Sequence, residues 1–273
     1  MENPGIPLRE FVHFDREKVE DFVSAILGGL PDERKETTVT KPSELGGSLG
    51  IDSTKLSFKK GARELSREEL LKATDASLFE RLHSLLEQND MIKAVDASDV
   101  QRWDTLQVGD FVEFQGKLEL SALERLFDMI RKLAPFIEIF SPEQAKDPDM
   151  KNVFKFVELF EQESYNVRIV PLEAQIEKLA FVASLQKDKT RASKEELVDE
   201  YAVFGRVKRK LAKNETFELF SLLPSGIKLP RKQIRELLAS FKDMPPFFGP
   251  APKIGDLRVF YPAIILTPVA IYR

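Results

Sequence analysis

The chain of 273 residues contains no cysteine. Disulfide bonds, thiolate metal ligands and cysteine nucleophiles are therefore excluded. Histidine is almost as scarce, because only His13 and His83 are present. His13 shares a strand face with Asp15 and could be oriented as a general base, but no serine lies nearby in the sequence to complete a triad. We expect core or surface roles for both histidines, and this scarcity argues against an enzyme.

Long apolar runs are also missing. The longest, residues 259–272, is too short to span a bilayer as a helix and contains two prolines. The first ten residues, MENPGIPLRE, lack the basic and apolar regions of a secretion signal. We therefore expect a cytoplasmic protein that does not engage a membrane.

A phosphate-binding loop is absent from the one glycine-rich stretch, residues 41–62. Gly46, Gly47 and Gly50 are not followed by the lysine and hydroxyl residue that a P-loop requires, and a G-x-G-x-x-G spacing does not occur. The carboxylates elsewhere lack the D-x-D-x-D-G order of a calcium loop. We interpret the stretch as a mobile connector and expect no cofactor and no metal.

The residues that are present predict an α+β protein. Apolar residues make up 42% of the chain and include 21 phenylalanines, which have no polar group and therefore favour a core role. Residue periodicity predicts helices and strands in alternation along the chain. The expected helices are 16–26, 76–90, 122–134 (limited by Pro135), 149–164 and 230–241. The expected strands are 9–15, 91–95, a strand pair or one bent strand in 104–120, 165–172, 177–186, a hairpin over 200–223 and a buried terminal strand in 257–273. We expect mixed, mainly antiparallel sheets with packed amphipathic helices.

Charge divides the chain unevenly. Residues 181–273 hold 17 Lys and Arg against 10 Asp and Glu, whereas the rest holds 24 against 35. We predict an acidic N-terminal α+β lobe, residues 1–164, and a basic, strand-rich C-terminal lobe, residues 165–273. A short likeness between FVEFQGKLE and YAVFGRVKR leaves two similar lobes as an open alternative.

The basic residues of the C-terminal lobe form the candidate binding site. On a strand, alternate side chains share one face, so a cationic row is expected there. The helix that follows could extend it and attract phosphates. The six candidates are Arg206, Lys208 and Lys210 on the strand and Arg231, Lys232 and Arg235 on the helix. A solvated hairpin edge, or a row that pairs with the acidic half, would explain the same pattern.

Three stretches carry a resemblance to a known family. They are the start LREFVHFDREKVEDFVSAI, the glycine-bend strand of residues 103–116, and the end PAIILTPVAIYR. Together they resemble a family of prokaryotic proteins of unknown function, with a strand–helix "REFVxFD" start and a terminal apolar "AIYR" strand. The resemblance covers nearly the whole chain and implies a cytoplasmic bacterial or archaeal protein. It transfers no catalytic residue.

These observations favour a non-catalytic binding or regulatory protein that acts through an unidentified protein partner or a small ligand. Two alternatives from other classes stay open. One is a nucleic-acid-binding protein that uses the basic hairpin. The other is a carboxylate-based phosphodiesterase or nuclease whose acidic residues meet only in space. A homo-oligomer is compatible with each of these functions.

Overall fold

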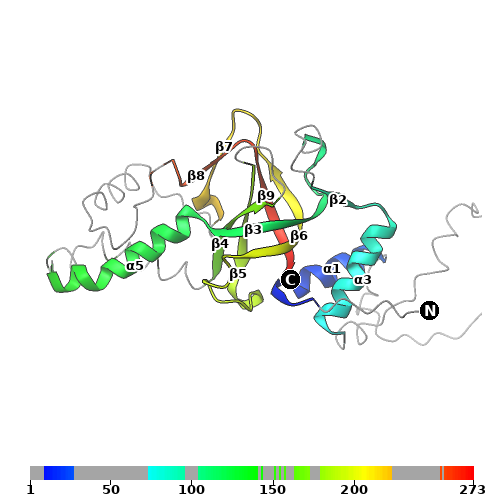
Figure 1. The fold of residues 1–273 in the computed structure, drawn as a ribbon, viewed down its shortest axis with the longest axis horizontal. Coiled ribbons are helices and arrows are strands. Elements are labelled where there is room, and N and C mark those ends of the chain that lie inside the picture. The colour runs from blue at the N-terminus through cyan, green and yellow to red at the C-terminus, as the bar shows by residue number, and fades with distance from the viewer. Residues whose placement is uncertain are drawn as a thin grey trace, which may run out of the picture. The chain divides into compact units, whose positions relative to one another are not determined.

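The computed structural model describes residues 9–27, 73–95, 104–140, 143, 151, 154, 157, 163–172, 179–222, 253 and 255–273. The connector expected at 41–62 and the helix expected at 230–241 lie outside these residues. Two compact units are formed: one contains Met1–Asp15 and Asp90–Arg273, and the other Arg16–Asn89. Figure 1 shows the elements of both.

In its described residues, the smaller unit contains two helices, α1 (Arg16–Ile26) and α3 (Asp75–Gln88). The side chain of Thr74 caps α3 by accepting a hydrogen bond from the backbone N–H of Ser77 at 3.2 Å. Arg16 joins the helices, because its Nη1 lies 3.0 Å from Oδ1 of Asp75. Both helices were predicted from their apolar stripes, and Leu78, Leu82 and Leu86 are buried as that stripe requires.

The larger unit is built around a barrel of five strands (Figure 1). The strands are β3 (Phe111–Leu120), β4 (Ser164–Pro171), β5 (Ala180–Gln186), β6 (Glu200–Lys210) and β9 (Ala263–Tyr272). β3 pairs with β4 and β6, β4 with β5, and β6 with β9, all antiparallel, whereas β5 and β9 are parallel. The predicted α+β class with mainly antiparallel strands is confirmed. The barrel takes strands from both sides of residue 164, where the sequence suggested a lobe boundary.

Two further strands extend this barrel, and two others form a sheet of their own. β1 (Phe11–Phe14) pairs antiparallel with β9, and β2 (Ile92–Ala94) pairs parallel with β3. β7 (Thr216–Glu218) and β8 (Arg258–Phe260) form a separate two-stranded sheet. The hairpin expected over 200–223 is therefore wrong, since β6 pairs with barrel strands and β7 with β8. The described residues also form helix α5 (Ala122–Phe140) and two short 3₁₀ helices, η3 (Lys187–Lys189) and η4 (Leu219–Leu222).

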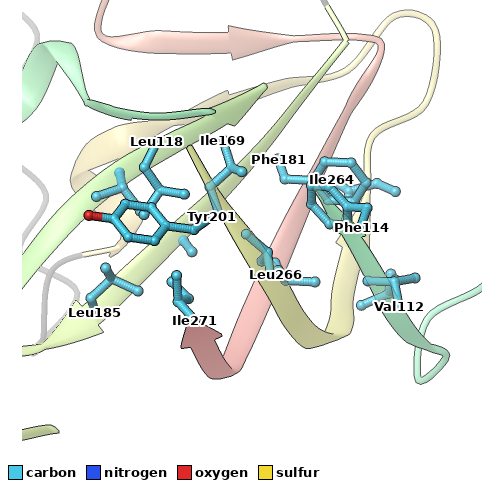
Figure 2. Packing of buried hydrophobic residues seen from close by; sticks show 14 of the residues in the cluster. Val112, Phe114, Leu118, Ile169, Phe181, Leu185, Tyr201, Ile264, Leu266 and Ile271 are labelled. Carbon is cyan, nitrogen blue, oxygen red and sulfur yellow. The ribbon is translucent and has the colours of Figure 1, made fainter. Parts of the chain in front are cut away.

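The barrel interior is filled by alternate residues from all five strands, as the two-residue period of a strand dictates. Figure 2 shows Phe114, Phe181 and Ile264 together, with Tyr201 close to Leu118 and Ile169. The rings of Phe114 and Phe181 are 4.4 Å apart between centroids. Phenylalanine thus fills the core, as its abundance predicted.

Gly205 is required by close packing at a register shift between β6 and β9. A Cβ atom there would lie 2.8 Å from the carbonyl oxygen of Thr267 and 2.9 Å from the side chain of Leu266. We expect Gly205→Ala to lower the free energy of unfolding by about 1–3 kcal/mol, measured by urea denaturation. Gly255→Ala is the control, because a Cβ atom at Gly255 meets nothing within 4 Å. Equal effects of the two changes would contradict this reading of the packing.

A second apolar cluster lies outside the barrel, where α5 packs against β5 and β9. Leu123, Leu126 and Ile130 of α5 meet Val182 of β5 and Ile265 of β9 in this cluster. The helix continues through Pro135 to Phe140, so the predicted end at Pro135 is wrong. Proline removes one backbone hydrogen bond, but the apolar face beyond it continues to pack: Ile137 is partly buried against the same cluster.

A buried group of charges fixes the start of α5. Oε1 of Glu124 accepts hydrogen bonds from the backbone N–H and the side-chain amide of Asn166 at 2.9 and 3.0 Å. Nζ of Lys194 lies 3.1 Å from Oε2 of Glu124 and 2.7 Å from Oδ1 of Asp128. Burial opposes the charged form of Lys194, but the two carboxylates outweigh it and raise the pKa of this lysine. Every charge in the group therefore has a partner.

Candidate functional site: a pocket on the barrel face

A pocket of about 360 Å³ lies on the outer face of β4 and β5. Val182 of β5 lines it, together with Ser121 and Ala122 at the start of α5. The segment from Gly255 to Tyr261, which contains β8, also contributes to the lining. We call this the barrel-face pocket. Its volume lies within the range of small-molecule sites, about 300–1,000 Å³.

Three arginines line the barrel-face pocket, one from each of three elements. They are Arg125 of α5, Arg168 of β4 and Arg258 of β8. Arg168 lies 3.7 Å from Glu119, and Arg258 lies 3.8 Å from Glu218. Both separations exceed hydrogen-bond distance, so these ion pairs leave guanidinium N–H groups able to bind another acceptor. The cationic side chains converge on the pocket although they are far apart in the sequence.

The pocket also has an aromatic rim. The side chain of Phe260 is 53% exposed, and Tyr261 follows it. Phe260 and Arg258 are two residues apart on β8, so their side chains project from the same face of that strand. The lining thus combines apolar and aromatic surface with three arginines and two carboxylates, Glu119 and Asp256. Apolar surface with a few polar groups is the composition of a small-ligand site.

The predicted basic row of β6 is only partly available. Arg206 is exposed, donates to the carbonyl oxygen of Gly109 at 2.9 Å and lies over the ring of Phe111. Nζ of Lys210 donates to the carbonyl oxygen of Asp104 at 2.7 Å and lies 3.3 Å from the Asp104 carboxylate. Lys208 is exposed. The row therefore contacts acidic and carbonyl groups of the segment before β3 at two of its three positions.

A neighbouring arginine that the prediction did not include is also neutralised. Arg209 forms an ion pair with Glu215, and this hydrogen bond lowers the pKa of the Glu215 carboxyl. Arg209 is exposed because the register shifts between Val207 and Arg209, which interrupts the alternation of the strand. Val207 and Leu211, on either side of the irregular stretch, are both buried.

Three predicted site residues, Arg231, Lys232 and Arg235, lie outside the residues that the structure describes. The pocket arginines and Phe260 were missed by the sequence prediction. No sequence pattern within one segment marks them. Arg125 lies on α5 and Arg168 on β4, and Arg258 and Phe260 lie on the three-residue strand β8. Only the closure of the barrel brings them together.

The two histidines have structural contacts. His13 is buried, and its Nδ1 lies 2.9 Å from Oγ1 of Thr190. That hydroxyl donates to the carbonyl oxygen of Gln186 at 2.6 Å, so Nδ1 of His13 carries the hydrogen and donates to Thr190. Nδ1 of His83 lies 3.5 Å from Glu87, one helical turn away. Within the described part of the chain, no group of three or more His, Asp or Glu residues could hold a metal ion.

A second pocket, of about 330 Å³, is lined by residues beside β1 and by the segment that leads into β6. Its polar groups bind one another: Arg273 pairs with Asp199 and donates to the hydroxyl of Tyr201 at 3.2 Å. Burial raises the pKa of Tyr201 despite the adjacent Arg273 charge. These groups already have partners, which makes the barrel-face pocket the better candidate site.

Comparison with known proteins identifies a family and no function. Residues 8–272 match the model of a family described as "Domain of unknown function (DUF6414)". The predicted resemblance to a family of unknown function over nearly the whole chain is confirmed. No curated protein matches the chain, and no solved structure matches it. None of the helices in the described residues has the length and apolar content needed to cross a bilayer.

Proposed function

The chain belongs to the DUF6414 family, whose description names no activity, and we propose that it is a non-catalytic binding protein. Its ligand is a small anionic molecule with an apolar or aromatic part, and it binds in the barrel-face pocket. The observation that carries the proposal is the convergence of Arg125, Arg168 and Arg258 on a pocket with an exposed phenylalanine at its rim. Arginine binds carboxylates and phosphates in a bidentate manner, whereas the aromatic rim covers apolar surface.

The order of the barrel strands supports this use of the pocket. Counted along the chain, the first barrel strand lies between the second and the fourth, and the third runs parallel to the fifth. This is the strand order of the OB-fold, in which ligands bind on the face of the second and third strands, between the first-to-second and fourth-to-fifth loops. β4 and β5 occupy those positions here. Because one fold hosts many functions, the residues of the pocket carry the argument and the strand order adds to it.

The nucleic-acid alternative on the β6 row has weaker support, since Lys210 and Arg209 face local acidic partners. No specific contact favours the carboxylate-based phosphodiesterase or nuclease. A protein partner stays a prediction. The proposal also places the protein in the cytoplasm, which is supported by the absence of cysteine from all 273 residues.

The anionic aromatic dye ANS tests the proposed function. We expect the double change Arg125→Ala/Arg168→Ala to weaken ANS binding about 2- to 30-fold, because each exposed charge contact contributes about 0.2–1 kcal/mol. Fluorescence titration at low salt measures the affinity. Arg131→Ala is the matched control, since Arg131 is also exposed on α5 but does not line the pocket. The same affinity in the double variant and the wild type would contradict the proposal.

A further inference from the structure

An exposed aromatic ring at the rim of the pocket points to the ligand class. The side chain of Phe260 is 53% exposed, although the barrel core and the outer cluster bury many other phenylalanines. β8 holds its backbone, because Phe260 pairs with Thr216 of β7. The ring therefore sits on a paired strand and offers a flat apolar face. Stacking of one nucleobase on such a ring contributes about 1–3 kcal/mol.

Cationic groups line the same pocket as this ring. Arg258 is two residues before Phe260 on the same strand face, which separates their attachment points by roughly 7 Å. Arg168 lines the same pocket from β4. Two guanidinium groups from different strands can bind the oxygens of one phosphate.

We propose that the barrel-face pocket takes a nucleotide unit, with the base stacked on Phe260 and the phosphate bound by Arg168 and Arg258. This inference rests on the proposed function and specifies its ligand. The unit can come from a free nucleotide or from a single-stranded nucleic acid, which share the same base and phosphate chemistry. A duplex does not offer this contact, because its base faces are already stacked within the helix.

Fluorescence anisotropy with a short labelled oligo-dT at low salt tests whether the pocket binds a single-stranded nucleic acid. Competition with uridine and adenosine monophosphates tests whether it binds a free nucleotide. One of these two ligands, oligo-dT or a monophosphate, should bind the wild-type protein. We expect Phe260→Ala to weaken the binding of that ligand by about 5–150-fold, which is the equivalent of one stacked base. Phe136→Ala is the matched control, since Phe136 is 44% exposed on α5 and does not line the pocket. Arg258→Ala should weaken binding and reduce the salt dependence by about one phosphate contact.

The outcomes separate the two proposals. If oligo-dT binds through Phe260 and monophosphates do not compete, the ligand is a single-stranded nucleic acid. If a monophosphate binds through Phe260, the ligand is a free nucleotide. Ribose phosphate, which has no base, should bind far more weakly than either. The nucleotide inference fails if ANS binds in the pocket while the nucleotides do not, or if ribose phosphate binds equally well and Phe260→Ala has no effect. Failure of ANS, nucleotides and oligo-dT alike removes the proposed function as well.

Discussion

A chain that ends before Pro262 is expected to lose cooperative folding. The deletion removes β9, which pairs with β1, β5 and β6 and so closes the barrel. Five of its aliphatic side chains are almost fully buried: Ile264, Ile265, Leu266, Val269 and Ile271. Burial of each contributes about 1.5–3 kcal/mol, so their loss alone matches a typical net stability of about 5–15 kcal/mol. Thermal melts followed by circular dichroism measure the effect.

Arg273→Ala is the control for this truncation. Arg273 follows β9 and pairs with Asp199 at the surface, so its loss should change the free energy of unfolding by no more than about 1 kcal/mol. A single core change, Ile271→Ala, should fall between the two, at about 2–5 kcal/mol. A truncated chain that stays in solution and melts like the full chain would show that β9 does not close the core.

The change Glu124→Leu is expected to lower the free energy of unfolding by about 3–5 kcal/mol. The side chains of Glu124 and Lys194 are 2% and 14% exposed, so the lysine charge would lose a close partner away from water. The backbone and side-chain N–H groups of Asn166 would also lose their acceptor. Urea denaturation gives the free energy.

Two further variants show whether buried charge causes this loss. Glu119→Gln removes a carboxylate from an ion pair of 3.7 Å whose side chains are 41% and 45% exposed, and it should cost no more than about 1 kcal/mol. The double change Glu124→Leu/Lys194→Met removes both buried charges together and should recover part of the stability. If Glu124→Leu costs as little as Glu119→Gln, the buried group is not a determinant of stability.

The candidate site was the least predictable part of the protein. The basic row around Arg206 was visible in the sequence because its charges alternate along one strand. The arginines of the barrel-face pocket come from α5, β4 and β8, and each looks like an ordinary surface residue in its own segment. A sequence pattern reports which residues share a face within one element. It does not report which elements meet.

The sequence by itself determined the local structure. Helical spacing placed α1 and α3, alternation placed β4 and β5, and the apolar run near the C-terminus predicted a buried strand where β9 lies. These features are predicted by the residue pattern within one segment. The tertiary structure alone decided that β6 joins β3 and β9 instead of turning into a hairpin with β7, and that β5 lies parallel to β9. Strands with similar alternation can pair in many orders, and the order is set by the closure of the barrel around one shared core, a condition that no single segment contains.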